Sequence, residues 1–421
     1  MQTQSESLLG LCRVLDLTDH RGFLCGRILG DFGADVIKVE PPGGDPIRRE
    51  GTPVHDIPGD LRRLYWDAYN VNKRGITLNL ASPAGAELFR RLARSAEIVV
   101  ESFSPGYLEG IGLGYADLSR ACPGIVMVSI TPFGQGGPWR DYTGSDLVLW
   151  ALSSYMYVTG DDDRPPVRIS LPQSYLHAGL EAAASTLVAL YHRRLTGRGQ
   201  QVDVSAHQSL AVISLQNQQY WNLAGFVPGR AGAAQSLSGV RWARQRRLWP
   251  CKDGYVAFVL FSGHLGAQGN HALTQWMESE GLAPQCMRRI DWNAFDPQGD
   301  ELSEREYLQI AEALGLFFRR HTKAELYDRA VRERIILCPC NTARDIVEDA
   351  HLSARGAWTE VSQPDVGRLV SFPQPCMRFS QAECRVRRRA PLVGEHNEEI
   401  YCGELGLSRD ELGSLCDRGV V

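Results

Sequence analysis

The feature that most constrains the fold is an alternation of strand and helix signals along the first third of the chain. Strand candidates lie at residues 14–17, 35–40, 98–100 and 125–130. The last two are apolar, β-branched runs, which are typical of strands buried in a parallel sheet. Helices are predicted over residues 23–32 and 83–95, the second with Ser82 as N-cap and Pro83 at its first position. This alternation predicts an α/β protein with an open, doubly wound parallel sheet.

Two later features interrupt the alternation. Residues 178–194 predict a long helix that is rich in small residues in its first half and ends before a Gly-rich segment. Residues 225–239 are rich in Gly, Ala and Ser, a composition typical of a linker. Beyond Trp249, a turn and a strand at residues 252–259 predict a second domain that extends to about residue 337.

Composition limits what the chain binds. Its 421 residues carry a formal net charge of −4, which excludes binding to nucleic acid through bulk positive charge. The eleven cysteines are scattered except for Cys338 and Cys340, so we expect free thiols in a reducing cytosol and no metal site. No run of 18 apolar residues occurs, and the polar N-terminus does not resemble a signal peptide. We therefore expect a cytoplasmic enzyme with no membrane partner.

A Gly-rich segment at residues 133–138 follows a predicted strand. A phosphate-binding loop would need a helix directly after it, and Pro138 and Trp139 disfavour one there. The segment is therefore either a flexible loop over a ligand or a plain turn. His177, near the start of the long helix, is likewise either a structural or a catalytic residue.

Motifs in the same order along nearly the whole chain resemble class III CoA-transferases, the family of formyl-CoA transferase and crotonobetainyl-CoA transferase. They lie at residues 14–18, 30–41, 72–80, 101–106, 112–115, 133–138, 193, 196–205 and 390–397. The resemblance implies a Rossmann-like large domain with a small α+β domain inserted in it, and two chains interlocked as a dimer. Residues 1–224 and 338–421 would then form the large domain, and residues 225–337 the linker and small domain.

The resemblance also implies a set of binding residues. Positions that match the family's CoA contacts are Asp19, His20, Lys38, Asn70, Lys73, Ser102 and Phe103. Ser102 stands where the family has Asn. A possible substrate loop contains Gly134, Gln135 and Gly136. No cofactor is expected, because coenzyme A or acyl-CoA is itself a substrate of this family.

The catalytic position departs from the family. In the transferases an Asp lies about four residues before the Gly that corresponds to Gly179, and it carries CoA as an enzyme thioester. Counting back from Gly179 reaches Tyr175, or Ser174 if one residue is inserted. A hydroxyl group can accept an acyl group but cannot become a CoA thioester. Glu181 lies beyond Gly179 and is expected to point elsewhere on the helix.

Racemases of the same family provide a second comparison, since they use a His and an Asp on opposite faces of the α-carbon. The His position matches Ser145, and the Asp position is the one already missing. We therefore predict no catalytic residue in this chain.

These losses favour a non-catalytic subunit of a heteromeric class III CoA-transferase. Such an enzyme would move CoA between an acyl-CoA, such as succinyl-CoA, and an acid, such as benzylsuccinate of anaerobic aromatic degradation. The expected partner is a homologous subunit that bears the Asp, in a heterodimer or heterotetramer. The alternatives are a homodimeric acyl-CoA isomerase, lyase or hydrolase that uses Tyr175, His177 or Glu181, or an acyl-CoA-binding protein. Trp150, Tyr155 and Tyr157 could line an aryl pocket or belong to the core.

Overall fold

The computed structural model describes residues 7–50, 64–235, 245–261, 263–295, 302–363 and 368–421. Its chain divides into two compact units. The first unit comprises Met1–Tyr155, Ile169–Gly225 and Ala350–Val421, and the second comprises Met156–Arg168 and Phe226–Asp349. Each unit is described by itself.

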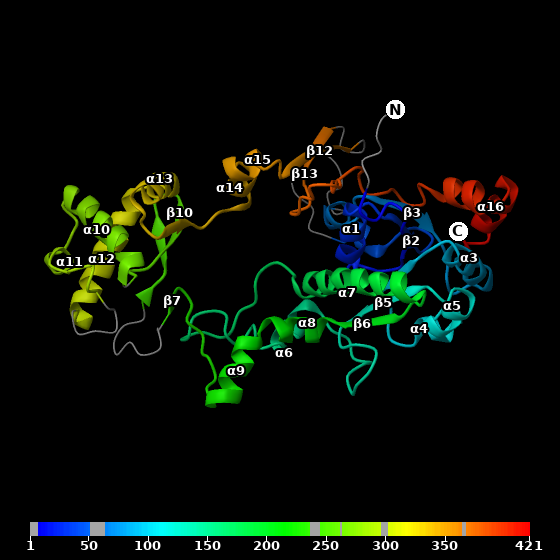
Figure 1. Ribbon diagram of the computed structural model, residues 1–421, viewed down its shortest axis with the longest axis horizontal. Coiled ribbons are helices and arrows are strands. Elements are labelled where there is room, and N and C mark those ends of the chain that lie inside the picture. The colour runs from blue at the N-terminus through cyan, green and yellow to red at the C-terminus, as the bar shows by residue number, and fades with distance from the viewer. Residues whose placement is uncertain (1–6, 51–63, 236–244, 262, 296–301, 364–367) are drawn as a thin grey trace. The chain divides into compact units, whose positions relative to one another are not determined.

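A six-stranded parallel sheet forms the centre of the first unit (Figure 1), with the order β3-β2-β1-β4-β5-β6. Its strands are β1 (Arg13–Asp16), β2 (Asp35–Glu40), β3 (Lys73–Thr77), β4 (Ile98–Glu101), β5 (Val126–Thr131) and β6 (Gln201–Ser205). The order in which the chain adds strands reverses between β1 and β4. This topology confirms the predicted open parallel sheet of an α/β fold.

Helices cover both faces of the sheet. α1 (Phe23–Asp31) packs against α7 (Ser174–Thr196), and Figure 1 shows α7 running alongside β5 and β6. The opposite face carries a core to which α3 (Pro83–Ala93), α5 (Tyr115–Ala121) and the π-helical turn η4 (Glu398–Glu404) contribute. The strands are therefore buried on both sides, as their apolar sequences predict.

Further elements complete the first unit. They are η1 (Pro46–Arg49), α2 (Leu64–Tyr69), α4 (Tyr107–Gly110), α6 (Asp146–Leu152), α8 (Ala206–Ile213), α9 (Leu215–Ala224), α15 (Ala350–Ala354), α16 (Arg409–Asp417) and the antiparallel pair β12 (Trp358–Gln363) and β13 (Arg368–Pro373).

The local sequence predicts the first residue of α3 correctly but not that of α7. α3 begins as predicted, because Ser82 Oγ accepts a hydrogen bond from the Gly85 amide at 3.0 Å and Pro83 occupies the first turn. α7 begins at Ser174, four residues before the predicted start at residue 178. Its extra turn is held by Asp146, which is distant in sequence.

The second unit has its own core of buried apolar residues. It contains the antiparallel sheet β11-β10-β9, the short pair β7–β8 and several helices, a small α+β arrangement. Its elements are β7 (Ala234–Gln235), β8 (Gln245–Arg246), β9 (Leu248–Cys251), β10 (Gly254–Phe258), α10 (Gly263–Ser279), α11 (Gln285–Arg288), α12 (Glu304–Arg320), α13 (Lys323–Glu333), β11 (Leu337–Pro339) and α14 (Ala343–Val347).

The second unit also takes in Met156–Arg168 and extends to Asp349, although residues 1–224 and 338–421 were predicted to form the large domain. Arg230 connects Met156–Arg168 to the linker, since its guanidinium donates hydrogen bonds to the carbonyls of Tyr157 and Asp161.

All eleven cysteines are free. Within the described residues, no helix combines the length and the apolar character that crossing a membrane requires. Nor do these residues bring three His, Cys, Asp or Glu side chains together as metal ligands.

Candidate functional site

Two cavities open at the carboxyl edge of the parallel sheet. The larger has a volume of about 570 Å³ and the smaller about 420 Å³. Both are lined by Asp19, His20 and Arg21, which we call the junction loop and which lies between β1 and α1. In open α/β sheets, ligands bind beyond the carboxyl ends of the strands where the strand order reverses. The junction loop follows β1 at that point, so the two cavities are the candidate site.

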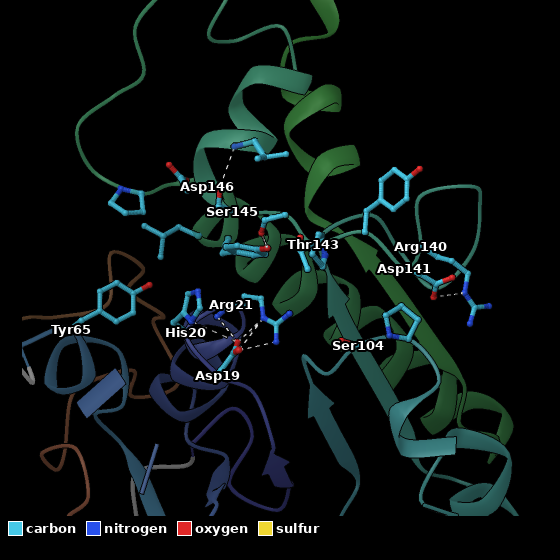
Figure 2. Close-up of a pocket in the computed structure, with 18 residues that line it drawn as sticks. Asp19, His20, Arg21, Tyr65, Ser104, Arg140, Asp141, Thr143, Ser145 and Asp146 are labelled. Atoms are coloured by element: carbon cyan, nitrogen blue, oxygen red, sulfur yellow. Dashed lines mark hydrogen bonds and ion pairs between the residues drawn. The ribbon is translucent and has the colours of Figure 1, made fainter. Parts of the chain in front are cut away.

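Hydrogen bonds fix the junction loop in place. Ser102 Oγ accepts from the Asp19 amide and donates to Asp19 Oδ1, both at 2.9 Å. Arg21 faces the same carboxylate, with Nε 2.9 Å from Oδ1 and Nη2 2.8 Å from Oδ2 of Asp19 (Figure 2). Burial opposes ionisation of Asp19, but the hydrogen bonds and charge of Arg21 outweigh it and lower the pKa of Asp19. Asp19 is thus an ion-paired carboxylate at neutral pH.

Beneath the junction loop lie three buried charged residues, Asp16, Lys38 and Lys73, which we call the buried charge cluster. Their side chains are at most 1% exposed. Lys38 Nζ donates to the carbonyls of Asp16 and Thr18. Asp16 accepts at Oδ1 from the amide and hydroxyl of Thr18, at 3.0 and 2.6 Å. The cluster therefore holds the main chain that leads into the junction loop.

Lys73 completes this cluster and ties it to α1. Its Nζ donates to Asp16 Oδ2 at 2.8 Å, to the Phe23 carbonyl at 3.0 Å and to Asn70 Oδ1 at 2.8 Å. Burial lowers the pKa of Lys73. Burial alone would raise the pKa of Asp16, but the two ammonium groups outweigh this effect and lower it.

The structure separates the seven sequence-predicted CoA contacts into two groups. Asp19, His20, Ser102 and Phe103 line the smaller cavity. Lys38, Asn70 and Lys73 line neither cavity, and their polar groups are bonded to protein atoms beneath it. A direct contact of these three with a ligand stays a prediction, whereas their support of the junction loop is an observed feature.

At the position where the family has its attacking Asp, both candidate hydroxyl groups have protein partners. Ser174 is fully buried, and its Oγ donates to Asp146 Oδ1 at 2.8 Å. Tyr175 lines the larger cavity, and its phenol donates to the Gly144 carbonyl. Burial raises the pKa of Tyr175 to about 12, so the phenol is protonated at neutral pH. Neither group is arranged as a nucleophile.

Asp146 is the residue that sequence reasoning did not connect to this position. Its Oδ1 accepts from the amides of Gln173 and Ser174 at 2.8 and 2.9 Å, besides the Ser174 hydroxyl. The sequence feature next to it is Ser145, the N-cap residue of α6, whose side chain accepts a hydrogen bond from the Val148 amide. Nothing local indicates that Asp146 also begins α7, because the two segments meet only in the folded chain.

Other sequence candidates lie outside the two cavities. Glu181 is exposed and His177 half-buried, and both are absent from the lining of these two cavities. In the Gly-rich segment, the Gln135 amide donates to both oxygens of Asp203, at 3.0 and 2.9 Å. Gly134, Gln135 and Gly136 line neither cavity, although the residues from Arg140 to Ser145 that follow them line the larger one.

Aromatic residues line the larger cavity, but Trp150, Tyr155 and Tyr157, which the sequence offered for an aryl pocket, are not among them. Trp150 is buried and packs against Tyr155, with ring centroids 5.2 Å apart. Tyr65 lies at the cavity wall (Figure 2), and Tyr142 and Tyr175 also line it. The ring of His20 meets that of Tyr175 edge-on, with centroids 5.9 Å apart.

Comparisons with known proteins agree with this geometry. The sequence profile of CoA-transferase family III matches residues 9–397. The chain is 34% identical over 414 residues to the BbsE subunit of succinyl-CoA:(R)-benzylsuccinate CoA-transferase from Thauera aromatica, covering 97% of each chain. It is 32% identical over 411 residues to succinyl-CoA–D-citramalate CoA-transferase from Chloroflexus aurantiacus, again covering 97% of each. A CAIB/BAIF family protein from Brucella suis superposes with a TM-score of 0.80 at 26% identity, covering 95% of this chain and all of that one.

Proposed function

Since the chain belongs to CoA-transferase family III, and is thereby a CoA-transferase, we propose that it is the non-catalytic subunit of a heteromeric enzyme. The enzyme would transfer CoA between an acyl-CoA such as succinyl-CoA and an acid such as benzylsuccinate. Its partner would be a homologous subunit that carries the attacking Asp. The similarity to BbsE, which is named as a subunit of such an enzyme, supports this proposal.

The observation that carries the proposal is the chemistry at the start of α7. CoA transfer in this family needs a carboxylate that can hold CoA as a thioester, a role that a hydroxyl group cannot take. Ser174 is buried against Asp146, and the Tyr175 phenol is protonated and bonded to a carbonyl. The competing hypothesis of an isomerase, lyase or hydrolase would need a base at residue 175, 177 or 181. Tyr175 lines the larger of the two cavities described here, and His177 and Glu181 line neither of these two.

The smaller cavity is our proposed CoA site. Its lining includes Asp19, His20, Ser102 and Phe103, which match the family's CoA contacts. The buried charge cluster beneath it has two ammonium groups and one carboxylate. The cluster holds the junction loop that lines this cavity, whose other charged lining residues are of both signs: Arg21, Glu40, Asp45 and Glu50.

Large apolar side chains are exposed on two helices of the first unit, which supports the proposal that the chain binds a partner subunit. Val188 and Leu195 of α7 are 69% and 68% exposed, and Trp221 and Leu223 of α9 are 59% and 84% exposed. Groups of large exposed apolar residues mark interaction surfaces. We propose that these helices contact the partner subunit in an interlocked heterodimer or heterotetramer.

The test is to purify the chain alone and together with a homologous subunit that carries the Asp, and to measure CoA transfer from succinyl-CoA to benzylsuccinate. We expect no transfer by the chain alone and transfer by the pair. The variant Tyr175→Asp places a carboxylate in the larger cavity, and Tyr175→Asn is its uncharged control. Transfer by the wild-type chain alone, at the rate of the pair, would contradict the proposal.

A further inference from the structure

Asp45 is a nearly buried carboxylate, 8% exposed, in the lining of the smaller cavity. Its Oδ1 accepts a hydrogen bond from the Ile47 amide at 2.9 Å and so caps η1. Within the part of the chain that the structure describes, no group donates to Oδ2. Burial raises the pKa of Asp45, an effect that outweighs the positive charge of Lys38. Since buried carboxylate oxygens ordinarily have hydrogen-bond donors, Oδ2 is an acceptor available to a ligand.

Two other carboxylates of this cavity, Asp19 and Glu40, already have donors. Arg48 donates to both oxygens of Glu40, at 2.6 and 2.7 Å, and the Asp45 amide donates to its Oε2 at 2.8 Å. Arg21 Nε lies 2.9 and 3.0 Å from the two oxygens of Asp19. Among the carboxylates that the structure describes in this lining, Asp45 is therefore the buried one with an oxygen left for a ligand.

Phe103 and Tyr107 line the same cavity as a pair of rings, which we call the aromatic platform. Their centroids are 4.7 Å apart and their planes are tilted by 31°. Phe103 packs against the core, and its amide donates to the buried Glu101 at 2.7 Å. Tyr107 begins α4 and is 39% exposed, whereas the next residue, Leu108, is buried and anchors this turn. An aromatic surface that is held from the core and open to the cavity suits stacking with a planar ring.

The rest of the cavity wall is largely apolar. It includes Val39, Pro41, Pro46, Ile47, Leu78 and Leu80. A volume of about 420 Å³ accommodates a bicyclic heterocycle. Together, the stacking surface, the apolar wall and the acceptor oxygen of Asp45 fit a planar base that carries an amino group.

We propose that Asp45 is a specificity-determining residue, whose Oδ2 accepts a hydrogen bond from the amino group of the adenine base of CoA while the base stacks on the aromatic platform. This inference rests on the proposed CoA site. Hypoxanthine has a carbonyl at the same ring position, and that carbonyl would face Oδ2 as a second acceptor. A site that bonds a polar group of its ligand rejects the analogue that lacks it, because the buried atom of the site is then left unpaired.

The experiment is isothermal titration calorimetry on the full chain with CoA and with its hypoxanthine analogue. The two ligands have the same phosphates and the same pantetheine arm, so they differ only at the base. We expect the wild type to bind CoA at least about tenfold more tightly than the analogue.

Two variants of Asp45 separate the contact with the base from the cap of η1. Asp45→Asn keeps an oxygen for the Ile47 amide but places an amide NH2 group where Oδ2 lies, so it should reverse the preference. Asp45→Ser also keeps a capping oxygen but has no second polar atom, so it should abolish the preference without reversing it.

Tyr107→Ala tests the aromatic platform. It should weaken the binding of both ligands about fivefold or more without changing the ratio of their affinities, and Tyr107→Phe should restore both. Glu50→Gln is the matched control, because it neutralises an exposed carboxylate of the same cavity lining, and it should leave the ratio unchanged.

Equal affinities of the wild type for the two ligands, a preference for CoA that survives in Asp45→Asn or Asp45→Ser, or a preference that depends on Glu50 would each overturn the inference. Binding of neither ligand would overturn the proposed CoA site along with it. A chain that prefers CoA through Asp45 but also transfers CoA alone would refute the non-catalytic role and leave this inference standing.

Discussion

Replacing Lys73 by Met tests whether the buried charge cluster is structural. Lys73 is fully buried, and Nζ donates to Asp16, Asn70 and the Phe23 carbonyl. Lys73→Met removes all three bonds and leaves Asp16 with Lys38, whose Nζ lies 3.6 Å from Oδ1. Breaking a buried ion pair by removing one partner costs about 3–5 kcal/mol. We therefore expect the free energy of unfolding to fall by about this amount.

The assay is urea unfolding monitored by circular dichroism, with CoA binding measured by calorimetry on the same samples. Asp16→Asn combined with Lys73→Met provides a second measurement, because it removes both members of the pair. We expect the double variant to lose less stability than the sum of the two single variants, with a coupling of about 0.5–3 kcal/mol. If Lys73→Met leaves stability unchanged but weakens CoA binding tenfold, Lys73 contacts the ligand and our structural interpretation is wrong.

Three further predictions concern the surroundings of the site. Burial raises the pKa of Glu101 to about 7 from 4.5, so the native state binds the proton more tightly than the unfolded state. The free energy of unfolding therefore falls as pH rises from about 4.5 to 7. In urea titrations, Glu101→Gln should stabilise the fold by up to about 3 kcal/mol at pH 8 and hardly at all at pH 4. Equal effects at both pH values would show that Glu101 is not protonated in the fold. Gly144→Ala should lower the melting temperature, at a cost of about 1–3 kcal/mol, because the added Cβ would lie 2.7 Å from Pro132 Cβ; Gly136→Ala, which has no atom within 4 Å of its added Cβ, is the control. Tyr175→Phe removes the bond to the Gly144 carbonyl and should cost about 1 kcal/mol in the same melting assay, without creating or removing transfer.

Much of the sheet follows from local sequence. The strands at the centre are buried on both faces, so their apolar runs are visible without the structure, and the cap formed by Ser82 marks the start of α3. β6 was not predicted, since three of its five residues are polar and its burial is partial. The early start of α7 was missed because Asp146, which holds it, belongs to α6.

The site was predictable in its loops but not in the direction of its side chains. Family motifs identified the residues around Asp19 and Ser102, which do line the cavity. They could not show that Lys38 and Lys73 point beneath it. The parallel register pairs Asp16 with Lys38 on neighbouring strands, and this cross-strand pairing becomes visible only once the strand order is known. A positively charged residue in a binding motif therefore does not by itself identify a ligand contact.

The hydrogen bonds at the start of α7 also explain how this scaffold can be intact without the family's attacking carboxylate. Asp146, rather than the residue at the catalytic position, accepts the first amides of the helix, and the Ser174 and Tyr175 hydroxyls have their own acceptors. Both hydroxyl groups at this position therefore have hydrogen-bond partners without a carboxylate at residue 174 or 175. The junction loop is held separately, by Ser102 and the buried charge cluster. Because the two supports are independent, loss of the nucleophile leaves the binding cavities formed, and this is the condition under which a subunit without its own catalysis can still bind a substrate.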